Sequence, residues 1–253
     1  DPAFIDRYMA EKLCSRLEAE QKVTDHKKLV KCQSAFYRSL KATIPYDEAI
    51  VVWDYTTVHD GSKPKTKDCG FTILARLEEG GECVRTFHDF LSTHGADFNF
   101  SRAAWNSFRD ETGIHRYKKL HIFSDNGLKN KYNLHYFQQM MLHDEVEIEL
   151  HFFAPYHGHS EIDGHFGQGK QGLRYSLGGV PLFGIEPITD AFAKLPNTDV
   201  VQLSEITELT PTFGKMQDGI KKWYNFQFTE IGDIICRKHS GATDYIIQEF
   251  EAT

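Results

Sequence analysis

The sequence predicts an α/β protein with a mixed sheet flanked by helices, an N-terminal helical segment and short C-terminal strands. Three observations predict it. Apolar residues recur at helical intervals at the start of the chain and then give way to short runs rich in Val, Ile, Phe and Thr. The first runs are joined by turns, whereas later ones alternate with helical stretches. With 253 residues, 40% of them hydrophobic and 13% aromatic, the chain can bury one sizeable core.

Residues 1–47 are predicted to form an N-terminal helical segment. Phe4, Tyr8, Leu13 and Leu17 recur at roughly helical intervals, and neither proline nor glycine occurs between Pro2 and residue 44. The segment is polar overall, so we expect one or two helices with a single apolar side.

Three strands with short connections are expected next. They span Glu48–Thr57, Cys69–Glu79 and Glu82–Ser92, and "EEGGE" between the last two indicates a tight hairpin turn. A helix is expected at 101–119, with Ser101 as its cap and Gly113 near its end.

The chain then alternates strands and helices. A strand at Leu120–Ser124, a helix at Lys131–Leu142 and a strand at Val146–Pro155 precede a glycine-rich segment. A helix at Ser160–Arg174 would follow, although each of its four glycines costs about 1 kcal/mol relative to alanine. Three strands and then helix, strand, helix, strand, helix is the order of a ribonuclease H-like domain.

Acidic residues occupy particular positions in this order. Asp54 follows the apolar "IVVW" inside the first strand, and Asp125 closes the fourth. Those two strands are neighbours in a ribonuclease H-like sheet, so we expect their carboxylates to meet. A carboxylate after four apolar residues is also costly to bury unpaired. Asp163 follows the fifth strand as the expected third acid, with Glu161 as its competitor.

Three blocks of sequence carry a family resemblance. "WDYTT", "IFSDNGLKNK" and "HFFAPYHGHSEIDGHFGQGKQGLR" resemble the three acidic blocks of a group of transposon-derived proteins similar to DDE-type transposases with a ribonuclease H-like core. The resemblance spans about Val51 to Arg174. Family members often carry a longer stretch before Lys-Asn, whereas here Gly127 leads directly into "LKN". The resemblance implies that Asp54, Asp125 and Asp163 are the catalytic, metal-binding acids.

Three such carboxylates would bind two Mg²⁺ or Mn²⁺ ions. Oxygen ligands favour these hard cations, which can activate water or a hydroxyl and neutralise the charge of a scissile phosphate. We expect Asp54 to bridge both ions, and Asp125 and Asp163 to hold one each. Asn126 and His159 are expected beside the acids, and His159 would orient Asp163 or a water.

Basic residues near these motifs are candidates for DNA binding. On a helix of 3.6 residues per turn, Lys170 and Arg174 share a face with Asp163 and would hold a substrate phosphate. Lys129 and Lys131, which follow the second acidic block, are candidates for a phosphate track. The remaining basic clusters are typical of solvated surfaces.

Residues 178–253 are predicted to be a C-terminal extension with short strands. The extension follows a ribonuclease H-like core at 48–177. It has proline and glycine punctuation, an expected helix at 189–194 and expected strands at 200–204, 225–238 and 244–250.

Composition excludes several classes of protein. The formal net charge of −7 argues against general adhesion to nucleic acid, and no stretch approaches the length of an apolar membrane span. The five cysteines are scattered, odd in number and without zinc-finger spacing, which predicts reduced thiols. We therefore expect an intracellular, nuclear protein that contacts DNA and no membrane, and a homo-oligomer is compatible with this interpretation.

These features favour metal-dependent cleavage or strand transfer on DNA by a transposase-derived nuclease domain, either a fragment of a transposase or a domesticated descendant. The first alternative is a non-catalytic DNA-binding or protein-interaction module on the same scaffold, such as a nuclear effector. The second is a zinc hydrolase centred on His157 and His159, with His151 and His165 nearby, since imidazoles and a carboxylate are good zinc ligands.

Overall fold

The structure is a computed structural model that describes residues 16–58, 65–155, 160–180, 184–209 and 219–249. The described strands form one mixed sheet in the order β6-β3-β2-β1-β4-β5-β7-β8-β9. The predicted α/β fold, with a mixed sheet flanked by helices, is therefore confirmed. None of the described helices combines the length and the apolar character needed to cross a membrane.

The central strands have the pairing expected of a ribonuclease H-like sheet. β1 (Glu48–Val58), β2 (Thr66–Arg76) and β3 (Cys83–Ser92) are antiparallel neighbours. β4 (Lys119–Ser124) pairs in parallel with β1 on the other side, and β5 (Glu147–Phe152) pairs in parallel with β4.

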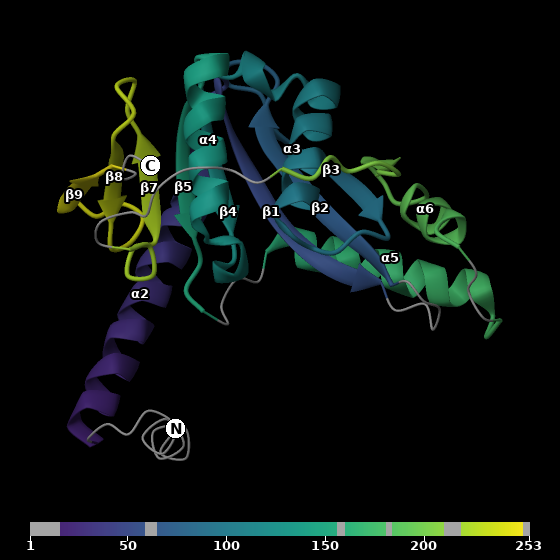
Figure 1. Ribbon diagram of the computed structural model, residues 1–253, viewed down its shortest axis with the longest axis horizontal. Helices are drawn as coiled ribbons and strands as arrows, with labels where there is room; N and C mark the ends of the chain where they lie inside the picture. The colour runs from purple at the N-terminus through teal and green to yellow at the C-terminus, as the bar shows by residue number, and fades with distance from the viewer. Residues whose placement is uncertain (1–15, 59–64, 156–159, 181–183, 210–218, 250–253) are drawn as a thin grey trace.

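Helices cover both faces of this sheet (Figure 1). They are α2 (Arg16–Thr43), α3 (Phe98–Thr112), α4 (Lys131–Asp144), α5 (Glu161–Leu177) and α6 (Glu186–Phe192), with short 3-10 turns η1 (Ile114–Arg116) and η2 (Asn126–Leu128) on either side of β4. Successive side chains of a strand point to opposite faces. Along β1, Val51 and Trp53 accordingly pack in the apolar cluster of α3 and α4, whereas Ile50 and Val52 pack in the cluster of α2, α5 and α6.

Residues beyond 178 add strands to both edges of the sheet. β6 (Thr198–Gln202) pairs in parallel with β3 at one edge. At the other edge, β7 (Asn225–Phe228) pairs with β5, and β8 (Ile234–Arg237) and β9 (Tyr245–Gln248) continue outward from it. One sheet thus runs through both the predicted core at 48–177 and the predicted extension at 178–253. The division of the chain into three parts stays a prediction.

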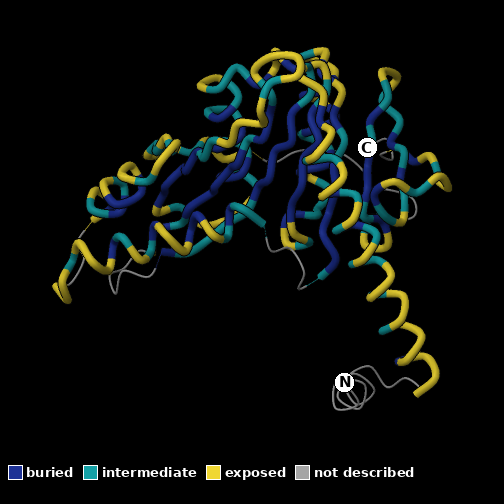
Figure 2. The backbone as a smooth tube through the Cα atoms, turned by 180° about the vertical axis from the view of Figure 1, so that it is seen from behind, coloured by how far each residue is buried: buried dark blue, intermediate teal, exposed yellow. Residues whose placement is uncertain are grey.

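Burial follows the same layering (Figure 2). The central strands are buried along most of their length, whereas the early turns of α2 are largely exposed and extend beyond the body of the protein (Figure 2). The later turns of α2 pack on the sheet, and Gln33 and Tyr37 are buried there.

The helix α3 differs from its prediction at both ends. Ser101 is not its cap, because the side chain of Asp97 accepts the hydrogen bond from the backbone nitrogen of Phe100 and caps the helix one turn earlier. The helix stops at Thr112 because Gly113 adopts a left-handed φ of 59°. Residues 114–116 form η1, 117 and 118 are a bend and Lys119 begins β4, so the predicted helix is too long at this end.

The glycine-rich helix α5 forms, and tight packing explains two glycines at its contacts. A side chain at Gly169 would collide with the ring of Phe192 on α6, and one at Gly70 on β2 would collide with Phe166 of α5. Glycine at both positions lets α5 lie close to the sheet and to α6, and this contact offsets the low helix propensity of the segment.

Candidate metal and phosphodiester site

The sheet topology brings the three predicted aspartates to one place. Trp53 on β1 and Ser124 on β4 are direct partners in a parallel pair. The next residue after each of these, Asp54 and Asp125, therefore lies at the same level of the sheet. Asp163 lies in the first turn of α5, which packs on β1. The charges of both Asp125 and Asp163 act on Asp54.

Local hydrogen bonds hold one oxygen of each carboxylate. Oδ1 of Asp54 accepts from the backbone nitrogen of Tyr55 at 2.7 Å. Oδ1 of Asp125 accepts from the backbone nitrogens of Gly127 and Leu128 at 2.8 and 3.2 Å. Oδ2 of Asp163 accepts from the backbone nitrogen of Ser160 at 2.8 Å.

The other oxygen of each aspartate has no hydrogen-bond donor among the described residues. Each acid is thus fixed in orientation while one oxygen stays available to a ligand. The oxygens of the three acids do not all lie within 4.8 Å of one another, a spacing that only one group of ligand atoms in the described parts of the chain reaches.

Asp54 is the electrostatically unusual member of the group. Burial raises its pKa, and the negative charges of Asp125 and Asp163 raise it further, to about 7 against an ordinary 3.8. The backbone hydrogen bond from Tyr55 and the charge of Lys170 act in the opposite direction. A divalent cation would favour the ionised form, so the carboxyl group can exchange a proton for a metal ion near neutral pH.

A cavity of about 300 Å³ opens beside two of the three acids, and Asp163 is not among its lining residues. Asp54 and Asp125 line it together with Asp97 and Ser101 at the start of α3. Sequence analysis did not select Asp97, whose signal was its place just before a helix. Its carboxylate serves as the helix cap and also lies 3.3 Å from Nε2 of His94.

The predicted DNA-binding residues separate into two groups. Lys170 donates a hydrogen bond to Oγ1 of Thr56 and acts by charge on Asp54, while Arg174, one turn further along α5, is exposed. These two residues lie on the helix that carries Asp163, as predicted.

Lys129 has a different environment from the one predicted. Its Nζ donates to the carbonyl oxygens of Lys221 and Trp223 at 3.1 and 3.0 Å and lies 3.9 Å from the ring centroid of Tyr224. Burial lowers its pKa to about 8. The side chain thus joins the loop after β4 to the C-terminal extension. Lys131 lies at the start of α4, with Nζ 5.2 Å from the ring centroid of Tyr132.

The predicted neighbours of the acids also have defined contacts. Glu161 accepts a hydrogen bond from the hydroxyl of Tyr37 at 2.6 Å and pairs with Lys41, so it ties α5 to α2. The amide of Asn126 donates to the carbonyl oxygen of Phe153, which holds the turn after β4 against the end of β5. His159 and His157 lie outside the described residues.

A buried acid pair next to this site escaped sequence analysis. Asp68 on β2 and Asp89 on β3 are fully buried, and no donor among the described residues reaches either oxygen of Asp68. Burial and the nearby Asp89 raise the pKa of Asp68 well above its ordinary value. Oδ2 of Asp89 lies 2.6 Å from Nε2 of His165, and Lys170 is the cation that acts on Asp68. The available signal was an acid within a strand, as for Asp54.

A second cluster of ligand type lies on β4 and β5. One nitrogen each of His121 and His151 and one oxygen of Glu149 all fall within 4.8 Å of one another. This is a candidate metal-binding cluster, distinct from the aspartates. Of the four histidines considered for a zinc site, it contains only His151.

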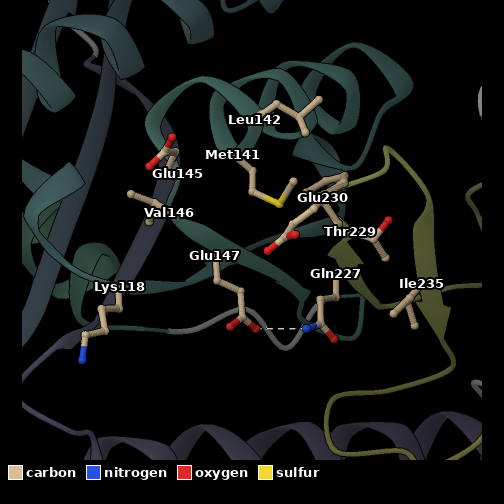
Figure 3. Close-up of a pocket in the computed structure, with 11 residues that line it drawn as sticks. Lys118, Met141, Leu142, Glu145, Val146, Glu147, Gln227, Thr229, Glu230 and Ile235 are labelled. Carbon is tan, nitrogen blue, oxygen red and sulfur yellow. Dashed lines mark hydrogen bonds between the residues drawn. The ribbon is translucent and has the colours of Figure 1, made fainter.

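A larger cavity of the described structure lies away from the three aspartates. It measures about 730 Å³ and is lined by the end of α4, the start of β5, β7 and β8 (Figure 3). Glu147 and Gln227 face each other in it, with Nε2 of Gln227 donating to Oε1 of Glu147 at 2.9 Å (Figure 3). The cavity contains none of the predicted catalytic residues, so its size alone gives no reason to place the chemistry there.

The sequence matches no protein-family model and no curated protein. Among solved structures, the chain is similar to a chain of the simian T-cell lymphotropic virus intasome in complex with the PP2A regulatory subunit B56 gamma. The two are 14% identical with a TM-score of 0.40, over 81% of this chain and 78% of the other.

Proposed function

We propose that this protein cleaves or joins phosphodiester bonds of DNA with two Mg²⁺ or Mn²⁺ ions, as a transposase-derived and domesticated nuclease domain. The observation that carries the proposal is the meeting of Asp54, Asp125 and Asp163 at the β1–β4 pair, each with one oxygen held and one oxygen available. The resemblance of the three acidic blocks to DDE-type transposases supports the same function.

The donor set fits hard divalent ions. Three carboxylates supply oxygen ligands, and Asp54, central in the sheet and under the charge of both other acids, is suited to bridge two ions while Asp125 and Asp163 hold one each. Bound ions would supply activation of the attacking water or hydroxyl and neutralisation of charge on the phosphate. The protein itself fixes the ligand orientations through the backbone nitrogens of Tyr55, Gly127 and Ser160.

DNA is the proposed partner, bound on the side of α5. Lys170 and Arg174 provide positive charge beside the aspartates in a chain whose net charge is negative. Removing one phosphate contact, as in Arg174→Gln, would weaken binding of any DNA sequence and lower the salt dependence of the affinity by about one unit of slope. A nuclear location and a homo-oligomer stay predictions.

Nicking of supercoiled plasmid tests the proposal. Purified protein with Mn²⁺ should convert supercoiled to relaxed circular DNA, and Asp125→Asn should abolish this. Asp110→Asn is the matched control, because Asp110 is an exposed acid near the other end of α3. Strand transfer is measured with a labelled duplex that carries a free 3′-hydroxyl.

The outcome separates the alternatives. Equal nicking by the wild type and Asp125→Asn contradicts the proposal. Binding of DNA without cleavage by either protein favours the non-catalytic module. In that case the phosphate track would differ from the predicted one, because Lys129 is bound to the C-terminal extension.

A further inference from the structure

Two histidines and a glutamate face one another inside the fold, on the side of the sheet under α2. His121 on β4 and Glu149 on β5 are direct partners across a parallel pair, and His151 follows two residues along the same strand, on the same face. Both histidines are almost fully buried, at 5% and 1% exposure. The ring of Phe36 on α2 lies 5.1 Å from the ring of His151 and covers the group.

The three side chains direct ligand atoms at a common centre. Nδ1 of His121 lies 3.4 Å from Nε2 of His151 and 3.7 Å from Oε2 of Glu149, and Nε2 of His151 lies 3.8 Å from Oε1 of Glu149. Ligands about 2.0–2.1 Å from a tetrahedral zinc ion are separated by about 3.3–3.4 Å. The two histidines approach different oxygens of Glu149, so a rotation of this carboxylate together with small shifts of the rings would bring one oxygen and both nitrogens to bonding distance.

The outer atoms of the cluster have the partners that metal-binding histidines require. Nε2 of His121 lies 2.8 Å from Oε2 of Glu48 on β1, which fixes its proton there and leaves the lone pair of Nδ1 facing the centre. Nδ1 of His151 lies 2.8 Å from Oγ of Ser240, and Nδ2 of Asn225 donates to Oε1 of Glu149 at 2.8 Å.

We propose that His121, His151 and Glu149 bind one zinc-class divalent ion in a structural site. Two imidazoles and one carboxylate favour Zn²⁺ or Co²⁺ over Mg²⁺ and Mn²⁺, so the site and the aspartates would select different metals. Its burial under α2 argues for a structural ion rather than a catalytic one. Ser240 and Asn225 come from the C-terminal extension, so the ion would tie that extension to β4 and β5.

Three features compete with the ion. Nδ2 of Asn225, which can only donate, lies 3.2 Å from Nδ1 of His151 and favours the proton of that ring on Nε2, toward the centre. A single proton between Nδ1 of His121 and Nε2 of His151 can also satisfy both rings, and zinc must displace it while the proton of His151 moves to Nδ1, where Oγ of Ser240 can accept it. Lys119 lies 3.1 Å from Oε2 of Glu149, which directs metal binding to Oε1.

The net charge of the side chains around the cluster is compatible with a bound cation. Glu48 and Glu149 are the carboxylates beside the two histidines, and Lys119 and Arg237 are the cations that act on them. Glu147 pairs with Lys119 and offsets its charge. A divalent ion would therefore compensate negative charge rather than add to a positive site.

Metal titration of the purified full chain tests the site. After removal of metals with EDTA, we expect one Zn²⁺ per chain, bound at least about tenfold more tightly than Mn²⁺. Co²⁺ should bind with the visible absorption of a four-coordinate ion, with a water as its fourth ligand. His121→Asn should abolish binding, and Glu48→Gln should weaken it by about 10–100-fold through the outer hydrogen bond. His143→Asn, which removes an exposed histidine of α4, and Asp125→Asn should leave zinc binding unchanged.

A crystal of the wild-type chain grown with Zn²⁺ settles the location independently of any variant. An anomalous zinc peak between His121, His151 and Glu149 supports the proposal even if His121→Asn does not fold. A chain that binds no zinc, or a zinc peak that lies elsewhere, overturns it. Retention of full zinc affinity in a folded His121→Asn variant would overturn it as well.

Discussion

Replacing Asp54 by asparagine should stabilise the metal-free protein at neutral and higher pH. Asparagine keeps the oxygen that accepts the hydrogen bond from Tyr55 but cannot ionise. In the folded wild type, burial and the charges of Asp125 and Asp163 raise the pKa of Asp54 to about 7, against an ordinary 3.8. The folded state thus holds the proton more tightly than the unfolded chain, and ionising Asp54 between pH 4 and pH 8 lowers the free energy of unfolding.

The size of the effect follows from the same shift. A pKa displacement from 3.8 to about 7 corresponds to about 4 kcal/mol at pH 8, since one unit is about 1.4 kcal/mol. Asp54 keeps partial contact with solvent, which reduces the expected gain of Asp54→Asn to about 2–4 kcal/mol. In a protein of this length, that range corresponds to a rise of about 5–15 °C in the melting temperature.

Urea unfolding in EDTA at pH 4.5 and pH 8 measures this prediction. Comparing wild type with Asp54→Asn at each pH cancels the titration of the groups that do not interact with Asp54. We expect the advantage of the variant to shrink to about 1 kcal/mol or less at pH 4.5 and to be clearly larger at pH 8. A stability difference that is the same at both pH values, or a variant that is less stable at pH 8, would refute the electrostatic account of Asp54.

Three further predictions concern the metal, the buried acid pair and the glycines of α5. Mn²⁺ affinity should rise by up to about tenfold per pH unit between pH 6 and pH 7, because the ion displaces the proton of Asp54. Calorimetry in buffers of different ionisation enthalpy would detect the released proton, and binding without proton release would exclude this exchange. Asp68→Asn should increase stability at pH 7 by about 1–3 kcal/mol, because Asp68 must take up a proton to be buried at this pH, whereas asparagine is neutral in both states. A loss of stability in urea unfolding would contradict this. Gly169→Ala should destabilise by about 1–3 kcal/mol through collision with the ring facing it on α6. Gly164→Ala, with open space around it, should stabilise by about 0.5–1 kcal/mol. Thermal melts in which both variants raise, or both lower, the melting temperature would count against the packing argument.

The order of elements and the places of the acids could be predicted because they depend on local patterns. Asp54 stands out as a carboxylate within an apolar strand, and Asp125 ends a strand whose neighbour the fold order already identifies. Asp163 follows from its motif, and the capping hydrogen bond from Ser160 explains why an acid suits the first turn of α5.

Details that depend on distant contacts could not be predicted. The choice of Asp97 over Ser101 as the cap of α3 depends on backbone angles, since both residue types are good caps. Lys129 points to the extension because Tyr224 and two carbonyl oxygens lie there, more than 90 residues later in the chain. The helix α5 forms despite its glycines because Gly169 packs against α6.

The cluster of His121, Glu149 and His151 was missed for a related reason. Its members meet through the register of β4 on β5, which the sequence does not display. The signal was present as polar residues at alternate positions of otherwise apolar strands, "KLHIF" and "EIELHFF", but only the strand pairing makes them one group.

A crystal soaked in Mn²⁺ and measured at the manganese absorption edge tests the central claim most directly. We predict two anomalous peaks, about 3.5–4 Å apart, with Asp54 between them and Asp125 and Asp163 each at one ion. Well-occupied Mn²⁺ peaks elsewhere in the crystal, with no peak beside these aspartates, would contradict the account.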